Sequence, residues 1–429
     1  MIFYNYIFER FVSVFNDRIN FFSSLVIILP IALISGNGAI PDIIISLIAI
    51  FFLITSIKNK EFIYYKNTVF ILFILFSVYG VIRSFFSEYI WESLTDEGTI
   101  FYFRFILFSM GIQYLINKNS KLILNLTKSI SFCIIFVFVD GTYQFLNGSN
   151  IFGIEPLSSY RMTSVMGEEA KLGRYVAFLS AILVILMNIL PKLKSKKIIL
   201  IALIPISLYV IFISGDRAPL LRYLIFLCLF ILFLKDFKKE YLISFILTIF
   251  ASLIFVYNSP LLKDRIIDTT IRDITSTSFK IAPFSSHYEE HYYSAYKMGS
   301  ENLIFGIGPN LFEKNCHKTQ YKISDRSCSS HPHNFFMQLF AELGIFGLSF
   351  FVLFYISILF GIIKFSYNKF FSDKIYNQSY NIGPNIYLFC FLLPLIPNMS
   401  FYNHWNNIFI FFVIGLLLYS NQNNTEIKT

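Results

Sequence analysis

Two short polar segments lie between apolar runs and carry side chains suited to proton transfer and anion binding. One of them, His331-Pro332-His333-Asn334, stands where a long polar stretch ends and an apolar run begins. A helix that starts there would hold His333 near its N-terminus, a position that favours the neutral imidazole. A neutral imidazole can act as a general base toward a hydroxyl group. A helix cap is the alternative use, and Asn334 suits that role better.

The second segment is a hinge, Ser214-Gly215-Asp216-Arg217-Ala218-Pro219, between two apolar runs. An arginine so close to hydrocarbon is costly unless it is paired or faces a watery cavity, so Arg217 is a candidate functional residue. Its planar guanidinium donates two parallel hydrogen bonds, which suits a phosphate group. The alternative is an Arg217–Asp216 contact that only anchors a tight turn.

A third polar stretch runs from Arg161 to Gly167-Glu168-Glu169 and enters another apolar run. One interpretation makes Arg161 a further anion contact, with Glu168 as the partner that orients it. The other places Glu168 and Glu169 at the start of a helix, where the helix dipole stabilises carboxylates.

The long polar stretch holds five of the six histidines, which raises the question of a metal site: His287, His291, His317, His331 and His333. No carboxylate or cysteine accompanies them at a spacing typical of zinc sites, so no metal is expected. Gly306-Ile307-Gly308 lacks the strand and helix context of a dinucleotide site, and a turn is its expected use.

Cys316 and Cys328 lie in the same polar stretch, and a structural disulfide between them is predicted if that stretch faces an oxidising compartment. The other cysteines, Cys133, Cys228 and Cys390, lie inside apolar runs, where cysteine behaves as a small hydrophobic residue.

These segments must be positioned by membrane helices. Of the 429 residues, 56% are apolar and 14% are charged, against roughly a quarter charged in soluble domains. Apolar runs of about 20 residues recur along the chain, each long enough to cross a bilayer. The chain is therefore predicted to be an all-α polytopic membrane protein with about twelve spans, at 19–36, 38–57, 67–86, 99–117, 122–146, 170–190, 198–213, 217–234, 240–257, 334–363, 384–400 and 404–420.

The joints between these spans differ sharply in lysine and arginine. Alternate joints carry basic clusters such as Lys192 to Lys197 and Lys235 to Lys239, whereas the others carry few basic residues. The positive-inside rule then predicts cytoplasmic termini. It also explains the net charge of +9 by membrane orientation, so no nucleic-acid partner is expected.

One outward joint is much longer than the rest. We expect spans one to nine within 1–257, a large periplasmic loop at 258–333, and the last three spans with a cytoplasmic tail within 334–429. Unusually long loops often carry function. Short surface helices are predicted at 288–300 and 310–314, broken by the glycine turn at 306–309.

In order and position, three blocks resemble those of the O-antigen ligase and polymerase superfamily of bacterial surface-polysaccharide enzymes. They are Ser214-Gly215-Asp216-Arg217-Ala218, the stretch Asn302 to Gly308 that ends in Gly306-Ile307-Gly308, and His333-Asn334 followed by Gly344 and Gly347. The blocks cover residues 210–350.

The resemblance implies transfer of a glycan from a polyprenyl diphosphate carrier to an acceptor sugar hydroxyl, at the periplasmic face of the bacterial inner membrane and without a cofactor. His333 would be the base, with His331 as second choice, and Arg217 would bind the diphosphate. The acceptor would be lipid A-core for a ligase, or a second lipid-linked glycan for a repeat-unit polymerase.

The chain departs from the family at one place. Members often carry an arginine near position 288, where this chain has His287, Tyr288, Glu289, Glu290 and His291. Either a histidine assumes the anion-binding role, or Arg265 or Arg272 folds in from upstream.

A small-solute or anion transporter is the alternative of another class. Transporters usually carry charged or broken spans near the middle of the membrane, whereas the polar residues here gather at the outer ends of the spans.

Overall fold

The computed structural model is helical throughout the residues it describes, which are 2–35, 38–190, 196–233, 238–275, 286–371, 382–394 and 396–426. The helices that precede the long loop are α1 (Ile2–Ile34), α2 (Ala39–Lys58), η1 (Phe62–Lys66), α3 (Thr68–Phe85), α4 (Ile90–Thr95), η2 (Asp96–Phe101), α5 (Phe103–Lys118), α6 (Leu122–Asn147), η3 (Ser164–Met166), α7 (Leu172–Ile189), α8 (Lys196–Ile213), α9 (Arg217–Phe233) and α10 (Lys238–Asn258). The later ones are α11 (Pro260–Lys263), η4 (Asp264–Asp268), α12 (Thr269–Thr275), α13 (Ser286–Glu301), α14 (Phe312–Cys316), α15 (Phe335–Phe371), α16 (Gly383–Phe391) and α17 (His404–Glu426).

Eight helices among the described residues are long and apolar enough to cross a membrane. This confirms a polytopic helical membrane protein. The eight correspond to the predicted spans at 19–36, 38–57, 67–86, 99–117, 122–146, 170–190, 240–257 and 334–363. The helix at 197–213 is apolar but shorter, and the count of twelve stays a prediction.

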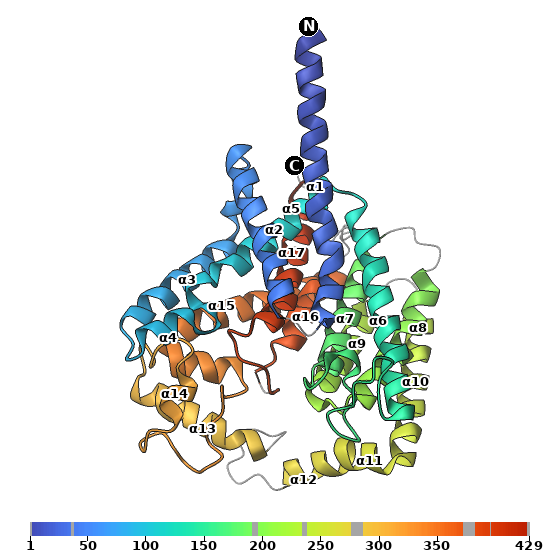
Figure 1. Cartoon of the computed structure of the whole chain (residues 1–429), viewed down its shortest axis with the longest axis vertical. Coiled ribbons are helices and arrows are strands. Elements are labelled where there is room, and N and C mark those ends of the chain that lie inside the picture. The colour runs from blue at the N-terminus through green and yellow to red at the C-terminus, as the bar shows by residue number, and fades with distance from the viewer. Residues whose placement is uncertain are drawn as a thin grey trace.

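The two chain ends lie at one end of the molecule, and the loop helices α11 to α14 lie at the other (Figure 1). Helices α13 and α14 coincide closely with the predicted short helices at 288–300 and 310–314. The described part of the long loop therefore contains several short helices.

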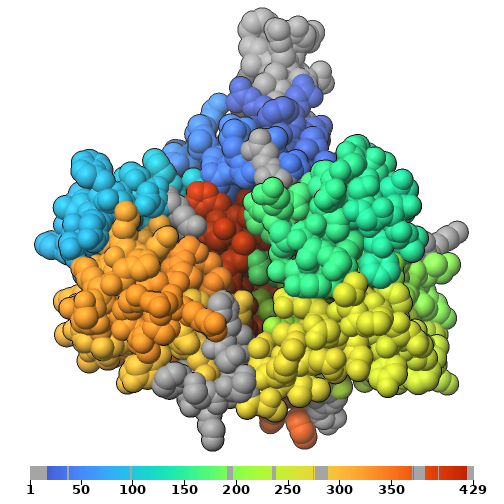
Figure 2. All heavy atoms as spheres, turned by 60° about the horizontal axis from the view of Figure 1, so that its bottom comes forward, coloured from blue at the N-terminus to red at the C-terminus, as the bar shows by residue number. Residues whose placement is uncertain are grey.

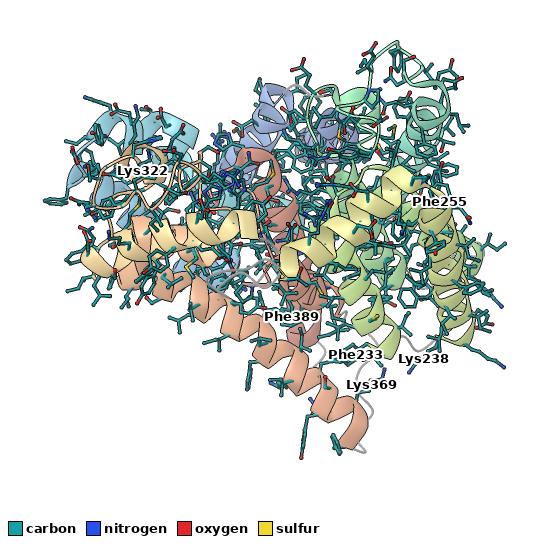
Figure 3. The ribbon with its side chains drawn as sticks, turned by 90° about the horizontal axis from the view of Figure 1, so that it is seen from below. Phe233, Lys238, Phe255, Lys322, Lys369 and Phe389 are labelled. Atoms are coloured by element: carbon teal, nitrogen blue, oxygen red, sulfur yellow. A yellow bond between two sulfur atoms is a disulfide. The ribbon has the colours of Figure 1, made fainter. Side chains whose placement is uncertain are left out.

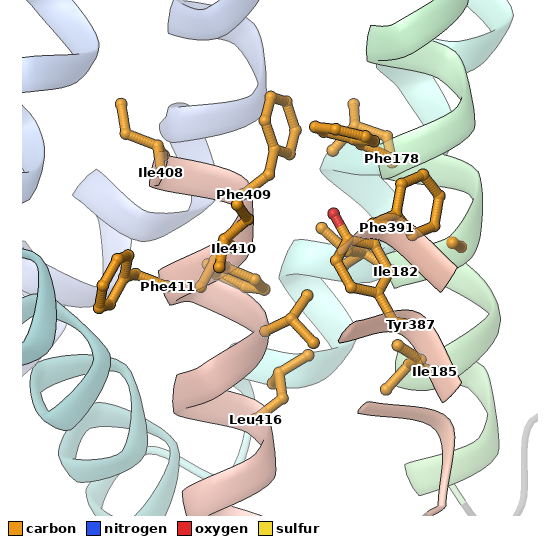
Figure 4. Close-up of a cluster of buried hydrophobic side chains, with 14 of the residues drawn as sticks. Phe178, Ile182, Ile185, Tyr387, Phe391, Ile408, Phe409, Ile410, Phe411 and Leu416 are labelled. Atoms are coloured by element: carbon orange, nitrogen blue, oxygen red, sulfur yellow. The ribbon is translucent and has the colours of Figure 1, made fainter. Parts of the chain in front are cut away.

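The centre of the bundle is formed by α7, α16 and α17. Helix α7 is buried over 83% of its span, against 22% for α10, as expected of a helix that is apolar on every side and surrounded by others. The ring of Phe178 lies 4.8 Å from that of Phe391 in α16 and 4.9 Å from that of Phe409 in α17 (Figure 4). These contacts pack α7, α16 and α17 closely together.

The predicted span at 384–400 is not one continuous helix. Helix α16 ends at Phe391, and the chain has no regular helix from 392 to 403 over its described residues. Pro394 and Pro397 explain the break, because proline lacks the amide donor that a helix needs and disfavours helical geometry in the residue before it. Irregular backbone at such a depth is tolerated where it is buried in protein or lines a cavity.

The predicted span at 334–363 also differs, since α15 is kinked at Gly344, where φ is 65° and ψ is −169°. The stretch Leu303 to Gly308 docks into the kink. Four backbone hydrogen bonds of 2.8–3.3 Å join the two segments, donated by Ile307, Gly308, Ile345 and Phe346. An added Cβ on Gly306 would lie 2.3 Å from the backbone of Glu342, and one on Gly344 would lie 2.4 Å from that of Ile304. We call this contact between 303–308 and 341–346 the glycine joint.

Far from this joint, the C-terminal part of α15 contacts the end of α9. Lys369 near the end of α15 donates to the carbonyl of Leu232, 3.1 Å away, and its ammonium group lies 5.4 Å from the centre of the Phe233 ring (Figure 3). The two helices therefore touch at their far ends, while their first residues lie close to the cavity described next.

Candidate active site

A cavity of about 520 Å³ lies at the loop end of the molecule. On that face the surface is hollowed between the lobe that contains α13 and α14 and the lobe that contains α10 to α12, with residues of the C-terminal segment at its base (Figure 2). The polar side chains that line the cavity are Arg161, Arg174, Asp216, Arg217, Arg265, Thr270, Tyr288, His331, His333 and Asn398. An apolar wall faces the same space, made by Pro219, Leu220, Leu221, Leu224, Ile266, Ile396 and Met399.

The hinge between α8 and α9 supplies one side of the cavity. Arg217 is the first residue of α9, and its guanidinium bonds to two residues of α12: Thr270 Oγ1 at 3.1 Å and Asp273 Oδ2 at 2.8 Å. The expected alternative, an Arg217–Asp216 contact, is therefore wrong. Asp216 pairs with Arg161 instead, at 2.9 Å.

The joint between α6 and α7 brings Arg161 to this hinge. Two buried side chains of α6 hold the joint in place. Gln144 accepts hydrogen bonds from the amides of Thr163 and Ser164, at 2.9 and 2.8 Å, and Asp140 accepts one from the Ser164 hydroxyl. The partner of Arg161 is Asp216, so the expectation that Glu168 orients it is wrong.

Two further arginines line the cavity without an ion pair among the described residues. Arg174 lies on the first turn of α7, and its Nε has no hydrogen-bond partner in the described part of the chain. Arg265, in η4, donates from Nε to the carbonyl of Gly215 at 3.3 Å. Burial lowers the pKa of Arg265, and the nearby Arg217 and Arg161 lower it further. The cavity thus concentrates positive charge that its own carboxylates do not fully compensate.

Asp216 lies among these cations. Burial raises the pKa of its carboxyl, while Arg161 and Arg174 pull in the opposite direction. One buried carboxylate shared among several arginines leaves a net cationic pocket, which is the electrostatic arrangement that attracts a dianion or a diphosphate.

The two predicted histidines lie together in the lining of the cavity. The ring centres of His331 and His333 are 4.1 Å apart, and that of Tyr288 is 4.8 Å from His333. Burial lowers the pKa of His331 to about 4, and Arg174 and His291 act in the same direction. His331 is therefore neutral near pH 7 and adds no charge to the arginines.

His333 has an unusual backbone. Its φ is 55°, in the left-handed region that residues other than glycine seldom adopt. Its carbonyl accepts a 2.6 Å hydrogen bond from the amide of Asn398 in the non-helical stretch after α16. Strained backbone of this kind persists only where its surroundings hold it, and it often occurs at active sites.

Asn334 forms the cap at the start of α15. Its Oδ1 accepts from the amides of Phe336 and Met337, at 3.0 and 3.2 Å, and its Nδ2 donates to the carbonyl of Pro394. The cap therefore fixes both the start of α15 and its contact with the non-helical stretch, and it leaves the His333 side chain to the cavity.

The remaining candidates fall outside the cavity lining. The ring of His291 is buried and lies 5.7 Å from that of His333. Arg272 is 66% exposed and pairs with Asp264, so of the two upstream arginines only Arg265 reaches the cavity. The side chain of His287 lies outside the described residues.

The four motif glycines lie away from the cavity, at the glycine joint or just beyond it. Gly306, Gly308 and Gly344 make its close backbone contacts. Gly347 follows on α15, where an added Cβ would lie 3.0 Å from the ring of Tyr79 in α3.

The cysteines of the loop form a disulfide, with the Cα atoms of Cys316 and Cys328 5.4 Å apart. Among the described residues, these two and His317 are also the one group whose potential metal-ligating atoms lie within 4.8 Å of one another. Sulfur atoms bonded to each other are not thiolate ligands, so this group does not resemble a zinc site.

Sequence reasoning missed Arg174, Arg222 and the non-helical stretch after α16. Both arginines lie inside predicted spans, and the cost of burying charge in a membrane, which singled out Arg217, applies to them equally. Pro394 and Pro397 were visible signals of a broken helix.

Residues 201–352 match the family model described as O-antigen ligase. The match runs from α8 through the hinge, the loop helices and the glycine joint into α15, and it includes all three blocks identified in the sequence. No curated protein matches the chain.

Proposed function

We propose that this chain, whose residues 201–352 match the O-antigen ligase family model, transfers a glycan from a polyprenyl diphosphate carrier to an acceptor sugar hydroxyl in the cavity between α7, α9 and α13. The observation that carries this proposal is the make-up of the cavity, which places four arginines and two histidines beside an apolar wall. A lipid-linked diphosphate has two matching parts, an anionic head that the arginines would bind and an apolar tail that would pack on the wall.

In the proposed reaction the acceptor oxygen attacks the anomeric carbon of the donor glycan. A new carbon–oxygen bond forms, the bond to the diphosphate oxygen breaks, and the polyprenyl diphosphate leaves with the bonding electrons. His333 accepts the proton of the acceptor hydroxyl, and His331 is the second candidate. The arginines stabilise the charge that develops on the leaving diphosphate.

The arginines differ in what they offer the donor. Arg217 and Arg161 already have carboxylate partners, which the diphosphate must displace or share. Arg174 and Arg265 have no carboxylate partner among the described residues, so the diphosphate would not have to displace one there. We infer that Arg174 and Arg265 are the further cations that bind the diphosphate beside Arg217.

The cavity would open at the periplasmic face of a bacterial inner membrane, with both chain ends in the cytoplasm. The basic joints support this orientation, and so does the separation of the chain ends from the loop helices. Leu220, Leu221 and Leu224 extend from the arginines along α9 and would contact the first isoprene units of the carrier.

The test is transfer by the purified protein in proteoliposomes, with a defined polyprenyl diphosphate-linked glycan as donor. Lipid A-core is the expected acceptor, and a second lipid-linked glycan is offered in parallel. Product on the second acceptor alone would identify a polymerase. No product on either, together with uptake of a labelled solute, would identify a transporter and overturn the proposal.

A further inference from the structure

Arg222 is the largest fully buried side chain among the described residues, with no exposed surface. It lies on α9, five residues after Arg217, and it does not line the cavity. Its Nη2 donates to two consecutive backbone carbonyls, those of Ile396 at 3.0 Å and Pro397 at 2.9 Å. The buried guanidinium of Arg222 therefore connects α9 by two hydrogen bonds to the non-helical stretch that follows α16.

That stretch is in turn bonded to the strained histidine. The residue after Pro397 is Asn398, whose amide donates to the carbonyl of His333 at 2.6 Å. Ile396, Pro397 and Asn398 also line the cavity. A short chain of contacts thus runs from Arg222 through two carbonyls and one amide to the backbone of His333.

Stability alone does not account for an arginine here. Nε and Nη1 of Arg222 have no hydrogen-bond partner in the described part of the chain. Burying a guanidinium whose donors are incompletely used is costly, and apolar residues of similar volume often stabilise such a site equally well or better. An apolar side chain could not, however, hold two carbonyls that have no helical partner.

We propose that Arg222 is a positioning residue that sets the orientation of His333 for catalysis by holding the non-helical stretch 396–398 against α9. This inference rests on the proposed function. Without the guanidinium, the two carbonyls would lose their donor and the stretch could shift, and the His333 backbone would relax from its left-handed conformation. The donor would still bind, because the cavity arginines are not altered.

The experiment measures transfer in proteoliposomes by wild-type protein and by Arg222→Ala, Arg222→Lys and Arg272→Ala. For Arg222→Ala, kcat is expected to fall about 100-fold, because misplacing a reacting group by about 1 Å costs that much. The KM for the donor should stay within about twofold, since ground-state binding is untouched. Arg272→Ala, an exposed arginine of the same loop end, should behave as wild type.

Added guanidinium chloride at millimolar concentration should restore part of the kcat of Arg222→Ala by occupying the space left by the side chain. Arg222→Lys should retain an intermediate kcat, because an ammonium group still donates to a carbonyl. If Arg222→Ala does not reach the membrane, the kcat and the donor KM of Arg222→Lys are measured in its place.

Three results would overturn the inference: an unchanged kcat in the Arg222 variants, a raised donor KM with unchanged kcat, or a loss of activity that follows the folded fraction and does not respond to guanidinium. These are read against His333→Ala in the same assay. Loss of transfer in His333→Ala beside full activity in the Arg222 variants rejects only the positioning role. No transfer by wild-type protein rejects the proposed function, and this inference with it.

Discussion

The cavity and the glycine joint are built in opposite ways. In the cavity, two of the four arginines, Arg161 and Arg217, have a carboxylate partner, and His333 adopts a backbone conformation that residues other than glycine disfavour. At the glycine joint, four backbone hydrogen bonds join two segments that touch without side chains between them.

Two charged side chains also stabilise the glycine joint through hydrogen bonds to its backbone and to the residues that follow it. Arg83 donates to the carbonyls of Phe305 and Gly306, at 2.9 and 2.7 Å. The buried carboxylate of Glu342 accepts from the amides of Asn310 and Phe312, at 2.9 and 3.2 Å. Unsatisfied charge and strain therefore mark the region with capacity for chemistry, whereas satisfied polar groups mark the region that supports it.

The largest loss of activity is expected at His333. Because it belongs to the strained cavity and not to the glycine joint, its replacement should lower the transfer rate and hardly change stability. His333→Ala should lower the transfer rate by about 1,000-fold, within the usual contribution of a general base, and should leave the melting temperature in detergent nearly unchanged. Radiolabelled or fluorescent donor measures the rate. His317→Ala, an exposed histidine of the same loop, is the matched control, and equal activity in the two variants would contradict the role of His333.

Arg174 comes next. Arg174→Met should lower kcat/KM by about 100-fold, because a charge-assisted hydrogen bond to the diphosphate is lost. Arg217→Met should cost less, about 10-fold, because Asp273 already shares that guanidinium. Donor titrations on the two variants and on Arg272→Ala measure the difference. A larger loss for Arg217 than for Arg174 would reverse this ranking of the cations.

At the glycine joint the effect should fall on stability. Gly344→Ala places a methyl group 2.4 Å from the backbone of Ile304 at a φ of 65°. Strain and overpacking together should destabilise the protein by about 2–4 kcal/mol, seen as a lower melting temperature. Gly153→Ala is the control, since its φ of 82° is similar but nothing lies within 4 Å; equal melting temperatures would reject close packing at the joint.

The smallest expected effect is the contribution of His331 to the pH dependence of stability. Its pKa falls from the ordinary 6.5 to about 4 in the folded protein. Between these values the unfolded chain binds more protons than the folded one, so stability from this group rises as the pH rises from 4 to 6.5 and is constant above. Melting curves of wild type and His331→Gln across this range should show a shallower slope for the variant, and parallel curves would contradict the shift.

Much of the local structure was predictable because it depends on nearest neighbours in the chain. Apolar runs of span length predict the long helices whatever surrounds them, and Asn334 caps α15 as an asparagine before an apolar run should. The order of the motif blocks predicted the match to the O-antigen ligase family model over residues 201–352, and it drew attention to Arg217 and His333, which both line the cavity.

The sequence by itself determined the helical membrane class, the ends of many helices and the residue types available for chemistry, because periodicity, length and capping are local properties of a chain. Only the tertiary structure decided which residues the charged side chains contact. Asp216 pairs with Arg161 and not with Arg217, Arg265 rather than Arg272 reaches the cavity, and Arg222 grips carbonyls some 174 residues away. Such pairings depend on how helices pack across the bundle, and that packing is the sum of many weak contacts that no single segment contains.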